Sequence, residues 1–373
     1  MSKVRLGIIG FGNIGASHAR LIAEGQVPDI EITAIADGSQ ETRVRAGEFF
    51  GKDFPVFSDG KELIKSGKAE AVLIAVPHYQ HPQIAIEAFL FGLHVLCEKP
   101  AGVYTKQVRE MNEAAEKSGK VFAIMFNQRT NSRYMKMREL VSGGTFGAVI
   151  RTSWIITNWF RCDQYYASGG WRGTWDGEGG GVLLNQCHHQ LDLFQWICGM
   201  PNRIRAFCHN GKWHNIEVED DVTAYLEYPN GATGTFVTST GEAPGTNRFE
   251  ISFEKGKIVY EGGSDITLYR LDSSHRDFCK TSKDSFASPA CTVEKLDLEE
   301  DKIQQHAAVM RSFAGRILRG EPLVAEGRQG INALILSNAM HLSSWLDKTV
   351  DIPFDEDEFL FQLNKRRKKN IPY

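Results

Sequence analysis

The chain has 373 residues, which is long enough for two domains of ordinary size. Hydrophobic residues make up 42% of it and charged residues 24%, the usual proportions of a globular protein in water. A formal net charge of −3 argues against an overall basic surface for nucleic acid, and no apolar run reaches the roughly 18 residues that a membrane span requires. The first residues lead straight into an apolar strand without a signal-peptide pattern. We therefore expect a cytoplasmic protein with neither a membrane nor a nucleic-acid partner.

The cysteines and histidines do not form a metal or disulfide pattern. The seven cysteines are scattered without a Cys-x-x-Cys pair, which predicts reduced thiols, several of them in the core. His188 and His189 are adjacent rather than four residues apart, and no thiolate cluster lies near them in the sequence. No metal is expected.

A strand, a glycine-rich turn and a helix open the chain. The apolar run Val4–Ile9 leads into Gly10-Phe11-Gly12-Asn13-Ile14-Gly15, and a helix-like segment follows over Ala16–Ala23. In this context the first glycine permits a tight turn, the second lets the backbone approach a pyrophosphate, and the third lets helix and strand pack closely. The diphosphate would rest on the N-terminus of the helix. The predicted contacts are Gly10, Gly12, Asn13, Ile14 and Gly15.

An acidic residue ends the next predicted strand. Asp37 follows Glu31–Ala36 at the distance expected for a residue that binds the adenosine ribose. Its carboxylate would repel a 2′-phosphate, so NAD is favoured as the cofactor, while Arg43 nearby leaves NADP open as the less favoured one. Asp37 is also suited to cap a helix over Gln40–Phe50.

Further strands alternate with helices over residues 1–126. The runs Ala71–Val76, His94–Cys97 and Val121–Met125 predict an α/β domain with a doubly wound parallel sheet of the Rossmann type. Ligands bind such sheets at the carboxyl ends of the strands, where Pro77 and Lys99 fall. Lys99 precedes Pro100, and a cis bond there would aim the lysine inward; otherwise it is an ordinary surface lysine.

The rest of the chain, 127–373, has a different pattern. A helix is expected over Ser132–Ser142, and alternation of polar and apolar residues then predicts an α+β domain with a large, mainly antiparallel open sheet. Its expected strands are Ala148–Asn158, Arg203–His209, Val222–Tyr228, Thr233–Thr240, Arg248–Phe253 and Lys257–Tyr260. Helices are expected over Lys302–Arg319 and Gly327–Asp347. The basic cluster Lys365–Lys369 is typical of a solvated tail. The polar segment between Arg270 and Glu299 has no clear assignment.

The segment Gly179–Asp192 combines three glycines with two histidines. A helix over Val182–Trp196 would place Asn185, His189 and Asp192 on one stripe, with His188 beside it. Such a stripe needs polar partners, and a packed core helix with satisfied histidines would also explain it.

An aromatic loop precedes this segment. Flat aromatic faces beside hydrogen-bonding side chains suit a sugar ring, although large side chains also pack beneath long loops. Its residues are Trp154, Trp159, Tyr165, Tyr166, Trp171, Arg172, Trp175 and Asp176. Arg129 and Arg172 are candidates for contacts to hydroxyl or carboxylate groups.

With these motifs in order, the chain resembles the Gfo/Idh/MocA oxidoreductases, which include glucose–fructose oxidoreductase, inositol dehydrogenase and the rhizopine catabolism proteins. The resemblance covers essentially the whole chain. It rests on Gly10 to Gly15, Asp37, Pro77 to His81, Glu98-Lys99-Pro100, Trp171-Arg172 and Gly179 to Asp192. It implies that His189 is the catalytic histidine and Asp192 the last acid of the motif. It also implies cofactor contacts from Pro77, His81, Glu98 and Lys99.

Two positions depart from the family pattern. Asn185 stands where the family has Asp, and His78 stands where it usually has Asn. An asparagine can hydrogen-bond a sugar hydroxyl or the histidine, but it carries no negative charge. Asn185 would therefore support a protonated His189 less well than an aspartate would.

The expected function is NAD-dependent oxidation of a secondary alcohol of a sugar, glycoside or cyclitol. His189 would take the hydroxyl proton as general base, Lys99 would hydrogen-bond the same oxygen, and Asn185 would orient the substrate or His189. The predicted substrate contacts are Arg129, Trp159, Tyr165, Trp171, Arg172, Asn185 and His188. The resemblance also implies a homo-oligomer, a dimer or tetramer joined through the second domain's sheet.

Two alternatives remain open. Transient oxidation of a glycoside followed by elimination would cleave it with catalytic NAD. A non-catalytic NAD-binding regulator is the other alternative, and the presence of both Lys99 and His189 argues against it.

Overall fold

A computed structural model of the chain describes residues 2–263, 265–299 and 301–368 and shows two compact units. The first unit combines Met1–Asn131 with Asp301–Leu334, and the second combines Ser132–Glu300 with Ile335–Tyr373. The sequence division at residue 126 assigns the segment 301–334 to the second domain instead. The structure places that segment in the first unit because Val309, Met310 and Phe313 join its hydrophobic core.

The first unit is built on a parallel sheet of six strands in the order β3-β2-β1-β4-β5-β6. This is the strand order of a Rossmann fold, and it confirms the predicted doubly wound sheet. The strands are β1 Val4–Ile9, β2 Ile30–Ala36, β3 Val56–Phe57, β4 Ala71–Ile74, β5 His94–Cys97 and β6 Phe122–Ile124. The helices are α1 Asn13–Ala23, α2 Gln40–Phe50, α3 Gly60–Lys65, α4 His81–Leu90, α5 Thr105–Ser118 and α10 Gln305–Arg319.

The second unit is built on a sheet of nine strands in the order β14-β13-β12-β11-β7-β10-β9-β8-β15. Among the strands that the structure describes in this sheet, only β7 and β10 pair in parallel, so the predicted large, mainly antiparallel sheet is confirmed. The strands are β7 Val149–Ile156, β8 Arg203–Asn210, β9 Glu219–Glu227, β10 Thr233–Ser239, β11 Asn247–Phe253, β12 Gly256–Glu261, β13 Asp265–Leu271, β14 Cys291–Leu296 and β15 Val350–Asp351. The helices are α6 Ser132–Ser142, α7 Asp163–Ala167, α8 His188–Cys198, α9 His275–Thr281 and α12 Glu356–Asn364. Helix α11, Gly330–Leu346, begins in the first unit and continues into the second from Ile335.

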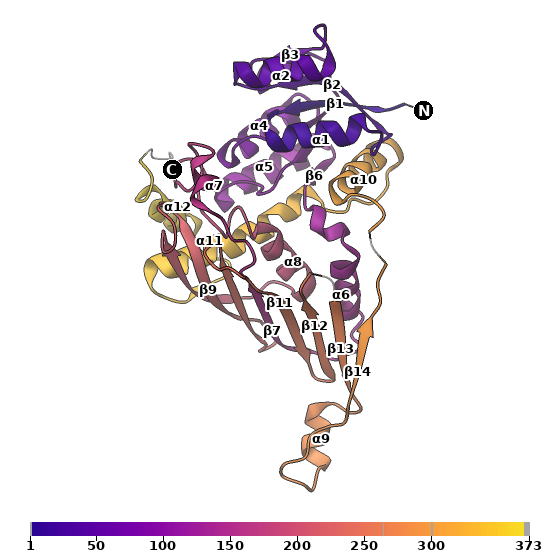
Figure 1. Cartoon of the computed structure of the whole chain (residues 1–373), viewed down its shortest axis with the longest axis vertical. Helices are drawn as coiled ribbons and strands as arrows, with labels where there is room; N and C mark the ends of the chain where they lie inside the picture. The colour runs from indigo at the N-terminus through magenta and orange to yellow at the C-terminus, as the bar shows by residue number, and fades with distance from the viewer. Residues whose placement is uncertain (1, 264, 300, 369–373) are drawn as a thin grey trace. The chain divides into compact units, whose positions relative to one another are not determined.

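The two faces of the large sheet have different environments. Helices α6 and α8 lie along one face (Figure 1), and strand residues on that face are buried, as the alternation along β9 predicts. Trp154 belongs to this buried face: its ring stacks on Phe249 with 4.3 Å between centroids, and it is 0% exposed. It is therefore a core residue and not part of a sugar-binding loop. The opposite face leaves Ile155, Phe207 and Tyr225 exposed.

The C-terminal segment differs from the solvated tail that its basic composition suggests. The Arg366 guanidinium lies 4.2 Å from the ring centroid of Trp345, and Arg367 Nε donates to Asp176 Oδ1 at 3.0 Å. Lys368 Nζ contacts Glu217 at 3.0 Å, while Lys369 lies outside the described residues. The described part of the basic cluster is thus anchored by acidic and aromatic side chains. None of the described helices is long and apolar enough to cross a membrane.

Candidate functional site

The turn between β1 and α1 requires glycine at two positions and leaves space at a third. Gly10 has φ 92°, and a Cβ on it would lie 2.4 Å from the carbonyl oxygen of Ala75. A Cβ on Gly15 would lie 2.0 Å from the carbonyl oxygen of Gly10, so this glycine lets α1 pack onto the turn. A Cβ on Gly12 would meet nothing within 4 Å. The three glycines therefore have the three roles expected at a dinucleotide-binding turn.

The N-terminus of α1 is suited to bind an anion. Gly12, Asn13 and Ile14 are exposed, no side chain caps the helix, and its first turn has no acidic residue. The first backbone N–H groups of a helix have no partner within the helix, and the helix dipole favours a negative group beside them. The N-terminus of α1 therefore offers a phosphate both unpartnered N–H donors and the positive end of the helix dipole.

Asp37 closes this turn from the end of β2. Its two carboxylate oxygens accept hydrogen bonds from the backbone N–H groups of Phe11 and Ser39, each at 2.8 Å. Ser39, not Asp37, caps α2, because the Ser39 hydroxyl accepts from Thr42 N at 3.3 Å. Arg43 donates to the carbonyl oxygens of residues 37 and 38, so its guanidinium is held by the backbone at the end of the strand.

The residues that follow β4 and β5 differ in exposure. Pro77 is exposed and Lys99 is partly exposed, whereas His81 and Glu98 are buried. His81 places Nδ1 2.7 Å from the carbonyl oxygen of Pro100 and Nε2 2.7 Å from that of Val76. Burial lowers the pKa of His81 although both carbonyls favour its protonated form. Both ring nitrogens face backbone carbonyls, so this geometry links the two loops and does not by itself support the predicted cofactor contact from His81.

Glu98 is likewise an internal support for Lys99. Its Oε1 lies 2.6 Å from His18 Nε2, and its Oε2 accepts from the backbone N–H of Lys99 at 3.1 Å. Burial would raise the pKa of Glu98, but the hydrogen bond with His18 and the charge of Lys99 hold it below its usual value. The predicted cofactor contact from Glu98 is not supported by this burial. The Lys99–Pro100 bond is cis.

In the second unit, α8 begins at His188 and not at Val182 as expected. Residues 179–187 form a turn around Glu219, whose Oε1 accepts from Gly181 N at 2.8 Å and Leu183 N at 3.1 Å. The segment donates these hydrogen bonds to Glu219, a residue of the distant strand β9, and the periodicity of the local sequence does not reveal such a partner. Asn185 therefore lies in the turn, and the predicted helical stripe holds only for His189 and Asp192.

Only Asn185 and His189 are not buried between Gly179 and Gln195. His188 is 0% exposed, with Nδ1 3.4 Å from the carbonyl oxygen of Leu183, so its burial does not support the predicted substrate contact from His188. Asp192 is 1% exposed and accepts from Gln195 Nε2 at 3.0 Å. In this buried segment, Asn185 and His189 are thus the two side chains that solvent or a ligand can reach.

Tyr165 gathers the polar groups around Asn185. Its Oη receives hydrogen bonds from Arg172 Nη1 at 2.6 Å, Gln186 Nε2 at 3.0 Å and Asn185 Nδ2 at 3.2 Å. The Arg172 guanidinium also lies over the rings of Tyr165 and Trp171, at 4.5 and 4.6 Å from their centroids. The structure therefore brings four predicted substrate contacts together and adds Gln186, which the sequence analysis missed.

Glu178 is a second residue that the sequence analysis missed. It is 1% exposed, and its two oxygens accept from Gly173 N at 2.7 Å and from Asn185 Nδ2. Burial raises the pKa of Glu178 to about 7, against the hydrogen bonds from Gly173 and Asn185 and the charge of Arg172. Only its place between glycines, two residues after Asp176, marks it in the sequence.

Other members of the aromatic loop have different environments. Trp159 is partly exposed, with the Arg161 guanidinium 5.6 Å from its ring centroid. Trp175 is 3% exposed and packs against His341 and Trp345, so it is a core residue. Arg129 lies in the first unit, is 3% exposed and donates to Gln329, so a substrate contact from it is not supported.

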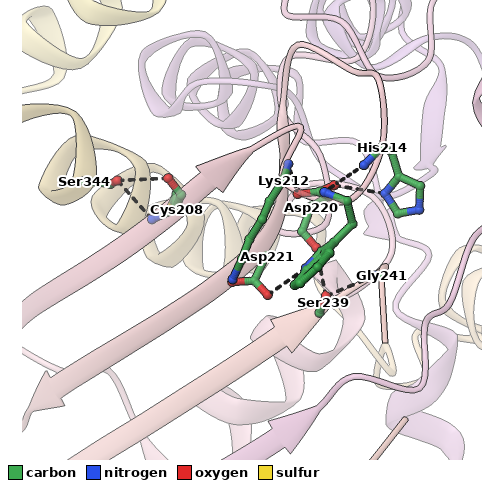
Figure 2. Close-up of polar contacts among 9 residues, drawn as sticks. Cys208, Lys212, His214, Asp220, Asp221, Ser239, Gly241 and Ser344 are labelled. Atoms are coloured by element: carbon green, nitrogen blue, oxygen red, sulfur yellow. Dashed lines mark hydrogen bonds and ion pairs between the residues drawn. The ribbon is translucent and has the colours of Figure 1, made fainter. Parts of the chain in front are cut away.

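The turn between β8 and β9 contacts the aromatic loop that contains Tyr166. The buried Asp220 carboxylate accepts from the backbone N–H groups of Lys212 at 2.9 Å, Trp213 at 2.8 Å and His214 at 3.0 Å. Figure 2 shows Asp220 beside His214 in this turn. The His214 ring lies 4.9 Å from that of Tyr166. Asp220 therefore fixes a turn on which α7 packs. Nowhere in the described part of the chain do three or more His, Cys, Asp or Glu side chains gather to hold a metal ion.

Comparisons with known proteins agree with this architecture. Residues 4–126 match the model of the oxidoreductase family with an NAD-binding Rossmann fold, and residues 134–259 match the GFO/IDH/MocA C-terminal domain. The chain belongs to the Gfo/Idh/MocA oxidoreductase family. The predicted resemblance is confirmed, and the first unit is an NAD-binding Rossmann domain whose glycine turn and helix N-terminus fit a dinucleotide.

Three relatives illustrate the range of the family. The rhizopine catabolism protein MocA of Rhizobium meliloti is 27% identical over 55% of this chain and 61% of its own length. D-glucoside 3-dehydrogenase of Escherichia coli is 29% identical over 62% of this chain and 68% of that protein. Myo-inositol 2-dehydrogenase of Thermotoga maritima is 24% identical over 90% of this chain and 95% of that protein.

A solved structure has the same fold along nearly the whole chain. The WlbA dehydrogenase from Bordetella pertussis, in complex with NADH and UDP-GlcNAcA, is 25% identical and superposes with a TM-score of 0.77. The match covers 95% of this chain and all of that one.

Proposed function

We propose that the protein oxidises a secondary alcohol of a sugar, glycoside or cyclitol with NAD as the oxidant. One observation carries the proposal: in the glycine–histidine segment only Asn185 and His189 are not buried, and Asn185 adjoins the cluster of Tyr165, Trp171 and Arg172. An aromatic face beside hydrogen-bonding groups suits a sugar ring. Names of relatives such as D-glucoside 3-dehydrogenase and myo-inositol 2-dehydrogenase support the same class of substrate.

Each residue has one chemical task in the proposed reaction. NAD, when bound, accepts the hydride from the carbinol carbon. His189 takes the hydroxyl proton as general base, because it is the one titratable side chain that the segment leaves partly exposed. Lys99 hydrogen-bonds the same oxygen and stabilises its developing negative charge, and Asn185 orients the substrate.

The test is NADH formation, followed by absorbance, over a panel of free sugars, glycosides, inositols and sugar acids. Turnover of one class with NAD, lost by about 10²-fold or more in Lys99→Ala and in His189→Ala, is the expected result. NAD binding should persist in His189→Ala, whose substitution lies outside the Rossmann unit. Release of an aglycone without net NADH would replace the proposal with cleavage by transient oxidation. NAD binding without any reaction across the panel would favour a regulator.

We further propose that the protein is a homo-oligomer joined through the open face of the large sheet. This face exposes Ile155, Phe207 and Tyr225, with exposed fractions of 38%, 51% and 43%. Apolar side chains gathered on one sheet face are typical of a subunit contact. Light scattering should give a dimer or tetramer for the wild type, and Phe207→Asp with Tyr225→Asp should shift it toward the monomer. A wild-type monomer at micromolar concentration would exclude this arrangement.

A further inference from the structure

Glu178 is a buried carboxyl group with no role in the reaction proposed above. It lies between Gly177 and Gly179, in the loop that leads into the glycine turn, and it is 1% exposed. A carboxyl group is costly to bury unless donors surround it. Here Oε2 accepts from Gly173 N at 2.7 Å and Oε1 accepts from Nδ2 of Asn185.

These contacts determine which way the Asn185 amide faces. An asparagine amide has two N–H donors on one side and a carbonyl oxygen on the other. Both donors of Asn185 have acceptors, one in Glu178 and one in Tyr165 Oη at 3.2 Å. The carbonyl oxygen Oδ1 is therefore directed away from Glu178. A half-turn of the amide would set Oδ1 against the carboxylate and lose the hydrogen bond between Asn185 and Glu178.

We propose that Glu178 is a positioning residue of the substrate site, whose ionised carboxylate holds the Asn185 amide so that Asn185 presents an acceptor to a substrate hydroxyl. The identity of that hydroxyl as one of a sugar or cyclitol rests on the proposed function, but the coupling of Glu178 to Asn185 does not. Asn185 then offers the substrate an oxygen atom, while the negative charge remains on the buried residue behind it.

Protonation of Glu178 would reverse this arrangement. A neutral carboxyl can donate to Asn185 Oδ1, and the amide could then turn and present N–H groups instead. Two charged groups that act on Glu178 are Arg172, which favours ionisation, and Glu219, which opposes it. Burial is the largest influence and brings the pKa of Glu178 to about 7. Glu178 in turn acts on Tyr166, a phenol whose pKa is raised mainly by its own burial and also by the charge of Glu178.

The coupling can be measured without any substrate. In the full-length protein labelled with 15N, the side-chain amide signals of Asn185 are assigned by their loss in Asn185→Asp. We expect these signals to shift between pH 5.5 and 8.5 with a midpoint near 7 in the wild type, and to lose this titration in Glu178→Gln. Signals that do not titrate, or that titrate equally in Glu178→Gln, would overturn the proposal whatever the enzyme's substrate is.

Kinetics distinguishes positioning from a merely structural role. In Glu178→Gln one of the two oxygens that accept from Gly173 N and Asn185 Nδ2 becomes an NH2 donor, so one of these hydrogen bonds is lost to a clash between donors. We expect kcat/KM for the substrate to fall by about ten- to hundredfold while KM for NAD stays unchanged. In Asn185→Asp two carboxyl groups would touch and share a proton, which should also impair turnover at neutral pH.

A double variant tests directly whether the orientation of the residue 185 side chain matters for turnover. Glu178→Gln with Asn185→Asp restores one carboxylate and one amide in contact, so kcat/KM should return to within about threefold of the wild-type value if orientation is what matters. A double variant no better than Glu178→Gln would reject the proposal. Glu254→Gln is the matched control, because Glu254 lies beside β7, where it accepts from Ala148 N at 3.2 Å, and should leave kinetics unchanged. A wild type inactive on the whole panel would count against the proposed function alone, since the amide titration still decides the role of Glu178.

Discussion

The carbonyl oxygen of Glu219 lies 1.9 Å from the point that a Cβ atom on Gly181 would occupy. The two residues are also joined by hydrogen bonds, since Gly181 N donates to Glu219 Oε1 at 2.8 Å and Val182 N donates to Glu219 O at 3.0 Å. A strand of the large sheet and the glycine turn thus meet backbone to backbone. This contact holds Asn185 outside helix α8 and next to Tyr165.

Gly181→Ala should therefore disturb the site. The added methyl group would meet backbone, which cannot rotate away, so we expect a loss of about 1–3 kcal/mol in the free energy of unfolding and a large loss of turnover. Gly47→Ala is the control: nothing lies within 4 Å of its Cβ position in α2, and alanine there should stabilise the helix by about 0.5–1 kcal/mol. Urea denaturation of both variants measures the difference. Equal stability of the two variants would contradict the close approach.

Glu178 should make stability fall as the pH rises through the range between its unfolded and folded pKa values. The folded protein holds the proton up to about pH 7, whereas the unfolded chain releases it near its ordinary value of 4.5. Stability from this group is complete below pH 4.5 and is lost as the pH approaches 7, by about 3 kcal/mol. Unfolding of the wild type and of Glu178→Gln at pH 5 and pH 8 tests this. Between pH 5 and pH 8 the free energy of unfolding of Glu178→Gln should rise relative to that of the wild type. A difference between the two proteins that is the same at both pH values would be inconsistent with the raised pKa.

Asp37 should determine both NAD affinity and the preference over NADP. Asp37→Asn removes the charge and replaces one of the two oxygens that accept from Phe11 N and Ser39 N with a donor. We expect NAD to bind at least about tenfold more weakly and NADP to gain relative to NAD. Calorimetric titration with each nucleotide measures both effects. Asp53→Asn, an exposed position, is the control, and an unchanged NAD-to-NADP ratio in Asp37→Asn would remove Asp37 from cofactor selection.

The anchored C-terminal segment should support the aromatic loop. Arg367 Nε donates to Asp176 Oδ1 at 3.0 Å, and the arginine side chain is only 10% exposed. Arg367→Ala should lower stability by about 1–2 kcal/mol and raise KM for the substrate, because Asp176 loses a partner in the loop that carries Trp171 and Arg172. Lys368→Ala is the comparison. Its side chain is 81% exposed beside Glu217, so water screens the pair and we expect no measurable change. Equal effects from the two alanines would argue against a supporting role.

Much of the fold follows from local sequence. Uninterrupted apolar strands, a glycine turn in strand–helix context and period-two alternation depend on neighbouring residues, and each predicted its element within a few residues. Helices α2 and α6 even begin and end where the sequence places them, at Gln40–Phe50 and Ser132–Ser142. The family resemblance depends on the same local motifs, and for this reason it was visible from the sequence.

What the sequence left undecided depends on residues far apart in the chain. Val309 and Phe313 join the first unit because burial of apolar surface does not follow chain order. His188 and His189 are adjacent, yet packing buries one fully and leaves the other partly exposed. Glu178 and Asn185 become partners, and Glu178 acquires a pKa of about 7, only when the loop has folded around them. Sequence determined which groups are present; tertiary structure decided which of them meet water, a hydrogen-bond partner or the core, and hence their charge and direction.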